Sequence, residues 1–340
     1  MAEDSTHKDF ILKRHHLLTP DKYVEGIRLG NRTVLSQAIT LIESTNEKHQ
    51  EIAQQIIEKC LPFSGNSIRI GITGVPGVGK STFINALGKQ ITGQEKKLAV
   101  LAIDPSSQKT KGSILGDKTR MDDLAIDPLA FIRPSPSAGS LGGVARATRE
   151  TIILCEAAGF EVIFVETVGV GQSETAVHSM VDFFLLLMLA GAGDELQGIK
   201  RGIMEMADTI AINKADEDNL LKAKTARMEY ANALHLFPPS ESGWIPKAEI
   251  CSALTNFNID KVWEIILSYQ RHNLASGYWH NKRKKQSKYW LHETINEGLL
   301  HLFYSKPHIK LMIENLENEV IENKISPFKA AKNLIESFKL

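Results

Sequence analysis

The sequence predicts an α/β fold built on a doubly wound, mostly parallel sheet. From Ile68 to about Leu267, short apolar runs alternate with helix-like segments, which is the pattern of such a sheet. Several runs are almost continuously apolar, as expected for strands that are covered on both faces. Polar motifs stand directly after several of the runs, where a doubly wound sheet binds its ligands.

Three segments are expected along the chain. Residues 1–61 form an N-terminal helical extension, because Thr19-Pro20-Asp21 is a helix-start signal and apolar residues recur at helical spacing after it. Residues 62–270 form the α/β domain, and residues 271–340 form a C-terminal helical arm. Strands of the α/β domain are expected at Ile68–Thr73, Lys97–Ile103, Phe131–Arg133, Val162–Glu166, Phe183–Leu189, Thr209–Asn213 and Ala248–Cys251.

The composition is that of an ordinary globular protein, with 43% hydrophobic and 24% charged residues and a formal net charge of zero. This balance gives no overall electrostatic footprint for nucleic acid. Cys60, Cys155 and Cys251 lie far apart, which fits a reducing compartment. The polar, acidic N-terminus is not a signal peptide, and the longest apolar stretch, Phe183–Ala192, is too short to span a bilayer. We therefore expect a cytoplasmic protein that binds neither nucleic acid nor a membrane.

A phosphate-binding loop is predicted directly after the first strand. Gly74 to Ser81 fits the pattern G-x-x-x-x-G-K-[ST], with an apolar run before it and a helix-like stretch after it. Glycines let backbone N–H groups point at phosphate oxygens, and the helix adds its positive N-terminal end. Lys80 can reach the β and γ phosphates, and the Ser81 hydroxyl can hold Mg²⁺. The expected nucleotide-binding residues here are Gly74, Val75, Pro76, Gly77, Val78, Gly79, Lys80, Ser81 and Thr82.

Carboxylates follow two further strands. Asp104 comes after Leu98–Ile103 and can face the phosphates and the metal, although a turn-forming Asp-Pro explains it equally well. Glu166 ends an apolar strand three residues before Gly169, which is the Walker B arrangement. In that arrangement the carboxylate contacts the metal through water, and the Gly N–H senses the γ-phosphate. Glu is one methylene longer than the usual Asp, so we expect a rearranged metal shell. Asp117, in a polar loop, is a weaker candidate for a switch segment.

A base-recognition motif follows a later strand. Asn213-Lys214-Ala215-Asp216 is the N-K-x-D box of GTPases. The Asp216 carboxylate can accept two hydrogen bonds from guanine, from N1–H and the exocyclic amine, whereas adenine offers neither donor in that geometry. Ser252-Ala253-Leu254, after the last expected strand, provides a turn that usually gives a backbone N–H to the guanine oxygen. Together these motifs predict binding of GTP and GDP rather than ATP.

Several stretches are more specific than these boxes. They are Leu101–Ser107, Leu115–Met121, Ile132–Ser137, Gly142–Ala145, Glu166–Glu174 and Gly193–Lys200. Together with the boxes, they resemble the methylmalonyl-CoA mutase-associated GTPases, the MeaB/ArgK family. The resemblance covers residues from about 65 to 260, and it implies a P-loop GTPase domain with an N-terminal helical extension and a C-terminal dimerisation arm.

The resemblance also implies a function and roles for residues. It implies GTP hydrolysis that gates the cofactor loading of an adenosylcobalamin-dependent acyl-CoA mutase, such as methylmalonyl-CoA mutase, and that protects this enzyme. Carried over by position, Lys80, Asp104 and Glu166 are the expected catalytic residues. The expected Mg²⁺ residues are Ser81, Asp104, Asp117 and Glu166. Lys200 lies in a segment expected to move with the nucleotide and to touch the mutase.

The C-terminal arm has the pattern of an interface. Trp290, Leu291, Ile295, Leu299 and Phe303 recur at helical spacing, and an amphipathic helix needs a partner surface. That surface is either the chain's own α/β domain or a second copy. A homodimer is the favoured expectation, because the segment follows the last strand of the domain.

Other nucleotide-dependent proteins remain as alternatives. A nickel-inserting metallochaperone GTPase needs thiolate or imidazole ligands, and the only close imidazole pair is His15-His16. A targeting GTPase would need a Met-rich or basic module, and a partitioning ATPase would carry a second Lys where Val75 stands. An older label for the family, a transport-linked nucleoside triphosphatase or kinase for basic amino acids, is opposed by the N-K-x-D box.

Overall fold

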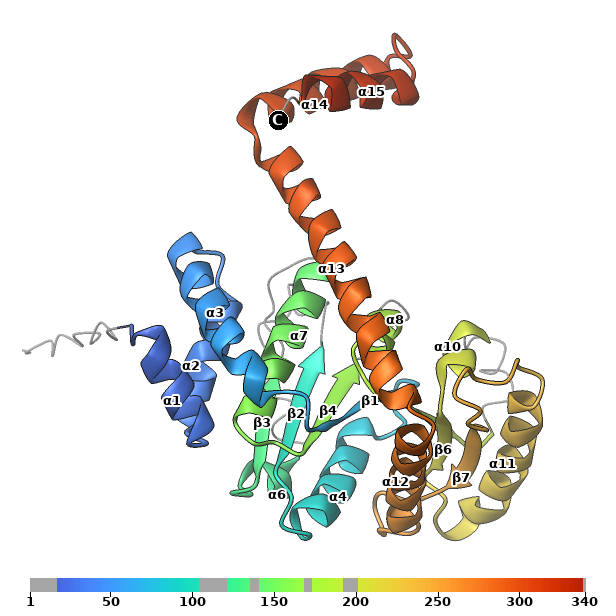
Figure 1. Ribbon diagram of the computed structural model, residues 1–340. Helices are drawn as coiled ribbons and strands as arrows, with labels where there is room; N and C mark the ends of the chain where they lie inside the picture. Colours follow the sequence, from blue (N-terminus) through green and yellow to red (C-terminus); the bar gives the residue numbers. More distant parts are fainter. Residues whose placement is uncertain (1–16, 104–120, 135–140, 168–172, 192–200, 339–340) are drawn as a thin grey trace, which may run out of the picture.

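The computed structural model describes residues 17–103, 121–134, 141–167, 173–191 and 201–338. Its centre is a seven-stranded sheet in the order β3-β2-β4-β1-β5-β6-β7 (Figure 1). Every strand pair is parallel. The predicted doubly wound α/β sheet is therefore confirmed, and the carboxyl ends of its strands meet at one edge.

All seven predicted strands are present, with ends shifted by a residue at most places. They are β1 (Ile68–Gly74), β2 (Leu98–Ile103), β3 (Ala130–Pro134), β4 (Val162–Thr167), β5 (Phe183–Leu189), β6 (Thr209–Asn213) and β7 (Lys247–Ile250). The central strands β1, β4 and β6 are buried at every position. Burial on both faces explains why their sequences read as continuous apolar runs rather than alternating ones.

Helices cover both faces of the sheet. On one face, α4 (Lys80–Thr92) and α12 (Ile259–Ala275) pack on alternate residues of β1, β2, β4 and β5. The other face is covered by the N-terminal helices α1–α3, whose bounds follow below, by α7 (Leu141–Ala157) and by α11 (Leu220–Leu234). Among the described residues, the α/β domain also has the short helices α6 (Asp122–Ala125), α8 (Ser173–His178) and α10 (Arg201–Met206) and the 3-10 turns Leu61–Phe63 and Glu217–Asn219.

The N-terminal region is helical, as its start signals predict. It contains α1 (Pro20–Arg28), α2 (Arg32–Ile42) and α3 (Glu47–Cys60), with Asn31 and Asn46 capping α2 and α3 through their side chains. These helices share one apolar core with α7 and the sheet.

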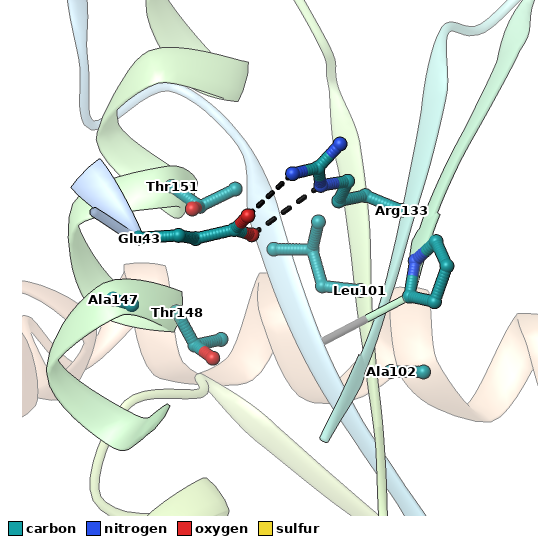
Figure 2. Close-up of a pocket in the computed structure, with 8 residues that line it drawn as sticks. Glu43, Leu101, Ala102, Arg133, Ala147, Thr148 and Thr151 are labelled. Atoms are coloured by element: carbon teal, nitrogen blue, oxygen red, sulfur yellow. Dashed lines mark hydrogen bonds and ion pairs between the residues drawn. The ribbon is translucent and has the colours of Figure 1, made fainter. Parts of the chain in front are cut away.

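An ion pair connects α2 to the end of β3. Arg133 donates through Nε to Oε1 of Glu43 at 3.3 Å and through a second nitrogen to Oε2 (Figure 2). Burial raises the pKa of Glu43, while the Arg133 guanidinium opposes that rise. The small cavity beside this pair, between β2, β3 and α7, is about 10 Å³, which is enough for a single water molecule and too small for an organic ligand.

The C-terminal region is a helical arm. α13 (Tyr278–Ser305) leaves the α/β domain after α12 and carries α14 (Pro307–Ile321) and α15 (Pro327–Ser337) at its far end, away from the sheet (Figure 1). The predicted apolar stripe of α13 divides into two parts. Trp290 donates its indole N–H to the Ser179 carbonyl at 3.0 Å, so it packs on the chain's own domain, whereas Leu291 and Leu299 are 59% and 50% exposed. Within the described ranges, no helix is both long and apolar enough to cross a bilayer.

Candidate functional site

The loop between β1 and α4 has the backbone conformation that its glycines predict. Gly77 and Gly79 adopt φ angles of 76° and 87°, a region that side chains with a Cβ rarely enter. Gly79 is the residue before α4, so the loop leads directly into the helix N-terminus. The Gly-rich turn and the positive end of α4 therefore adjoin each other, which is the arrangement of an anion-binding loop.

Two contacts hold this loop closed. The Lys80 ammonium donates to the Gly74 carbonyl at 3.0 Å across the loop. Gly74 lies so close to β5 that an added Cβ would stand 2.5 Å from the Leu187 carbonyl oxygen, and only glycine fits there. Val78 is fully buried and pins the middle of the loop to the core, whereas Pro76 and Gly77 are exposed.

Asn213 joins the phosphate loop to the base-recognition loop. Its Nδ2 donates to the Val78 carbonyl at 2.8 Å, and its Oδ1 accepts from the Ala253 N–H at 3.0 Å. The side chain is 2% exposed. The sequence motif predicts Asn213 as a base-binding residue, but its described hydrogen bonds brace the two loops against each other. The predicted strand Thr209–Asn213 correctly places Asn213 at the end of β6, but its contacts with Val78 and Ala253 were not evident from the motif.

Asp216 and Ser252 lie side by side. The Ser252 hydroxyl donates to Asp216 Oδ2 at 3.2 Å, and the Ala215 N–H donates to the Cys251 carbonyl at 3.0 Å. The intervening Lys214 adopts a φ of 59°, which turns the chain sharply after β6. This arrangement brings the N-K-x-D box and the Ser-Ala-Leu turn together at the carboxyl edge of the sheet, and Leu254 is 78% exposed there.

The predicted Walker B carboxylate ends the strand next to β1. Glu166 is 8% exposed and pairs in register with Ile72 of β1 and Ala102 of β2. The next residue, Thr167, donates its hydroxyl to the Thr73 hydroxyl at 2.8 Å. This buried contact fixes the end of β4 against the start of the phosphate loop, and it is a positioning contact that sequence reasoning missed.

Part of the predicted site cannot be placed. Asp104, Asp117, Gly169 and the segment 193–200 lie outside the described residues. Among the residues that are described, no group of three or more His, Cys, Asp and Glu side chains gathers as a metal centre. The described geometry brings Lys80, Ser81, Glu166 and Asp216 to one edge of the sheet. They come from three places: the start of α4, the end of β4 and the loop after β6.

Comparison with known proteins identifies this arrangement. The family model described as methylmalonyl Co-A mutase-associated GTPase MeaB matches residues 35–308. The chain belongs to this family. The match extends beyond the sheet, from α2 through the whole of α13 to the first residues of α14. It therefore includes N-terminal helices and the first helix of the arm as well as the nucleotide motifs.

Relatives of this MeaB-family chain carry two kinds of name. GTPase ArgK of Escherichia coli is 46% identical over 92% of this chain and 95% of its own length. A mitochondrial methylmalonic aciduria type A homolog of Mus musculus is 44% identical over 94% of this chain and 79% of its own. Among solved structures, a LAO/AO transport system kinase superposes with a TM-score of 0.77 at 38% identity, over 96% of this chain and 100% of its own.

The MeaB-family chain is a P-loop GTPase, and its family binds GTP and GDP. The described loop geometry suits that chemistry. The positive end of α4 and the Lys80 ammonium both lie at the loop that fits the phosphate-binding pattern, and the Asp216 carboxylate lies beside the Ser-Ala-Leu turn. Association with methylmalonyl-CoA mutase is implied by the family's name.

Proposed function

We propose that this protein is a GTP-hydrolysing chaperone of an adenosylcobalamin-dependent acyl-CoA mutase such as methylmalonyl-CoA mutase. The GTPase binds the mutase, gates the loading of the mutase's cofactor and protects the mutase. The observation that carries this proposal is the extent of the family match, residues 35–308. A match that includes helices on both sides of the GTPase motifs supports a shared partner rather than a shared hydrolase alone.

The proposed nucleotide contacts follow from the loop geometry. Backbone N–H groups of the loop from Gly74 to Thr82, in which only Pro76 lacks one, hold the phosphates. The Lys80 ammonium moves from the Gly74 carbonyl to the β and γ phosphates when nucleotide enters. Asp216 reads the guanine edge, with the Ala253–Leu254 turn near the guanine oxygen. Asn213 acts in this scheme as a brace for both loops, because its two amide atoms already hold Val78 and Ala253.

Magnesium fits the oxygen donors that the described site offers. Ser81 lies in the first turn of α4 and Glu166 at the end of β4, and hydroxyl, carboxylate and phosphate oxygens are the ligands that Mg²⁺ prefers. We propose that Ser81 holds the ion and Glu166 orients its water shell, with Asp104 and Asp117 as further members. When bound, the ion would neutralise charge that develops on the phosphates.

The arm is proposed as the homodimer interface. Its outer helices expose large apolar side chains, including Leu311 at 63%, Ile321 at 76% and Phe328 at 87%. Large apolar side chains exposed on helices that extend away from the domain are typical of an interface. We accordingly keep the division into a helical extension (1–61), a GTPase domain (62–270) and a dimerisation arm (271–340) as part of the proposal.

A second candidate function is favoured only by names. A transport-linked nucleotide-dependent enzyme for basic amino acids is suggested by the titles GTPase ArgK and LAO/AO transport system kinase. A nickel metallochaperone is disfavoured, because the cysteines Cys60, Cys155 and Cys251 are all free and fully buried and therefore unsuited to capturing a metal from solution.

The test measures GTP turnover with and without an adenosylcobalamin-dependent methylmalonyl-CoA mutase from the same source. A partner that completes the charge shell around the phosphates accelerates GTPases by roughly 10³–10⁵-fold. We expect the mutase to change turnover and to bind the GTP-bound and GDP-bound forms with different affinities. By linkage, GTP must change the affinity for mutase, relative to nucleotide-free protein, by the same factor as mutase changes the affinity for GTP. Lys200→Ala is expected to leave GTP binding near normal while reducing the mutase effect.

Two outcomes would contradict the chaperone. The first is a mutase that changes neither turnover nor nucleotide affinity. The second is turnover that instead rises with lysine, arginine or ornithine, which would favour the transport-linked candidate. Equal binding of ATP and GTP by the unaltered protein would contradict the guanine assignment on which both measurements depend.

A further inference from the structure

A second cavity lies at the opposite edge of the sheet from the nucleotide motifs. Its volume is about 420 Å³, within the range of about 300–1,000 Å³ typical of small-molecule sites. It opens beside Asp208, the residue before β6, whereas the N-K-x-D box follows the other end of that strand. The sheet therefore separates the cavity from the phosphate loop.

The cavity wall is mostly apolar and aromatic. It is built from the end of α8, from α10, from the connection between α11 and β7, and from the facing sides of α12 and α13. Its apolar and aromatic members include Met204, Leu234, Phe237, Trp244, Tyr269 and Tyr278. Such a wall favours a ligand with an apolar or aromatic body.

The connection that forms one wall is ordered by its own hydrogen bonds. The Ser242 hydroxyl accepts from the Trp244 N–H at 3.1 Å, and the Ser240 hydroxyl donates to the Trp244 carbonyl at 2.9 Å. The Trp244 indole donates to the Asp208 carbonyl at 3.0 Å and lies edge-on to Tyr269 at 5.3 Å between ring centroids. The wall is thus formed before any ligand arrives, which lowers the entropy cost of binding.

The charged groups of the cavity are unbalanced. Asp208 and Glu205 supply two carboxyl groups, and Lys282 supplies one ammonium. That ammonium is held by the Asp182 carbonyl at 2.6 Å and lies 3.5 Å from the Tyr269 hydroxyl. The imidazole of His178 stays neutral at pH 7, because burial first and the nearby Lys282 second lower its pKa to about 4.

Asp208 is the group that distinguishes this cavity from an apolar void. Its Oδ2 accepts from the Phe184 N–H at 2.9 Å, which fixes the carboxyl group at the cavity wall. Burial raises the pKa of Asp208 to about 6 despite the neighbouring Lys282. A buried carboxylate is stabilised further by a cation brought next to it, even where one cation is already near.

We propose that this cavity binds a small organic ammonium ion with an apolar or aromatic body, with Asp208 as the charge partner. One positive charge on the ligand balances the excess carboxylate. Its body lies against Trp244 and Phe237. The Lys247 ammonium already stands 5.0 Å from the centroid of the Trp244 ring, so Asp208, and not that ring, is the partner of the ligand charge. A carboxylic acid of the same shape is disfavoured, since it would meet Asp208 and Glu205 directly.

The test compares three probes of one shape: 2-phenylethylamine, 2-phenylethanol and 3-phenylpropionate. Binding to the full-length protein is measured by saturation-transfer NMR and calorimetry at pH 7.5, with GDP and Mg²⁺ present so that the nucleotide site is filled. We expect the amine to bind at least tenfold more tightly than the alcohol, and the acid to bind more weakly than either.

Three variants identify the site. Asp208→Asn keeps the shape of the side chain and an acceptor for the Phe184 N–H. It is expected to weaken binding of the amine at least tenfold and to leave binding of the alcohol unchanged. Lys282→Gln removes the ammonium that competes with the ligand for Asp208, and it is expected to tighten binding of the amine. Glu264→Gln is the matched control, because it alters an exposed carboxylate of α12 outside the cavity. It is expected to change binding of neither the amine nor the alcohol.

Melting temperature and GDP affinity check that each variant folds. Several results would overturn the proposal. They are equal binding of the three probes, an Asp208→Asn protein that folds and binds the amine as the unaltered protein does, displacement of the amine by GTP from the nucleotide site, or no binding of the amine at millimolar concentration.

Discussion

The guanidinium of Arg283 makes two hydrogen bonds to the carboxylate of Asp182, from Nε to Oδ1 at 2.8 Å and from a terminal nitrogen to Oδ2 at 2.7 Å. Asp182 stands directly before β5, and its Oδ2 also accepts from the Arg69 N–H of β1 at 2.8 Å. The same guanidinium reaches the carbonyls of Gly65 and Ser67. One side chain of the arm is therefore bound to the starts of two central strands.

Loss of this bidentate pair is expected to loosen the arm and destabilise the domain. Arg283 and Asp182 are 14% and 2% exposed, and removal of one partner from a buried pair costs about 3–5 kcal/mol. Arg283→Ala should lower the free energy of unfolding in urea by an amount of that order. Arg283→Lys should recover only part of the lost stability, because an ammonium cannot make the two parallel hydrogen bonds that a guanidinium makes to a carboxylate.

The control for this prediction lies on the same helix. Lys285 pairs with Glu241 at the surface, where both side chains are 66% exposed, and exposed pairs contribute little. Lys285→Ala should leave the unfolding curve unchanged. An Arg283→Ala protein as stable as Lys285→Ala would show that the arm is held by apolar packing instead.

Asp216→Asn is expected to exchange the nucleotide preference. The amide can donate to the extra carbonyl of xanthine, whereas the carboxylate pairs with the two donors of guanine. The variant should lose affinity for GTP and gain affinity for xanthosine triphosphate in calorimetric titrations. Its neighbour Ser252 keeps a hydrogen-bond acceptor in this variant, since Asn retains a carbonyl oxygen in place of the Oδ2 that now accepts the hydroxyl.

Lys80→Ala is expected to abolish GTP hydrolysis and to weaken nucleotide binding strongly. The ammonium supplies charge at the β and γ phosphates and also closes the loop on the Gly74 carbonyl. Phosphate release and fluorescent-nucleotide binding measure the two effects separately. Lys222→Ala, an exposed lysine of α11, is the matched control, and equal turnover in the two variants would refute the role of Lys80.

Substitutions on the exposed side of α13 are expected to break the proposed homodimer. Leu291→Asp and Leu299→Asp place charges on residues that are 59% and 50% exposed in the single chain, so the fold of one chain should be preserved. Light scattering should report monomers for these variants and dimers for the unaltered protein. Leu221→Asp, on the 76% exposed side chain of α11, should remain dimeric, and a monomeric unaltered protein would contradict the assignment.

Asp208 should make stability fall as pH rises from about 4 to about 6. Its folded pKa is raised by burial from 3.8 to about 6, so the folded state holds the proton more tightly than the unfolded state does. Well below pH 4, Asp208 is protonated in both the folded and the unfolded state, so it does not lower stability. Above pH 6 it is ionised in both states, and the full cost of burying its charge is present. Relative to Asp208→Asn, the unaltered protein should lose up to about 3 kcal/mol across this window.

Asp127 should behave in the opposite sense. Burial alone would raise its pKa, but hydrogen bonds from Lys89, the Leu129 N–H and Thr92 lower it from 3.8 to about 2. Its contribution to stability should therefore be present above pH 4 and lost as pH falls toward 2. Chemical unfolding of Asp208→Asn and Asp127→Asn over pH 2–8 distinguishes the two signs.

The sequence by itself determined the sheet and the nucleotide motifs. Each strand is a local apolar run that can be read without knowledge of its neighbours, and Gly74 to Ser81 and Asn213 to Asp216 are contiguous patterns whose chemistry requires their spacing. The helical extension and arm were readable for the same reason. Helix-start signals and apolar spacing are properties of a few consecutive residues.

Only the tertiary structure decided which distant residues meet. Asn213 braces Val78 and Ala253, and Thr167 binds Thr73, because parallel strands bring their carboxyl ends to one edge. Trp290 packs on Ser179 while Leu291 stays exposed, a division that follows from the direction in which α13 leaves the domain. Asp208 has the sequence context of a plain strand-start residue. Burial raises its pKa, and the side chains that oppose this rise, Tyr269 of α12 and Lys282 of α13, lie more than 50 residues away in the sequence. Such an environment leaves no local pattern to read.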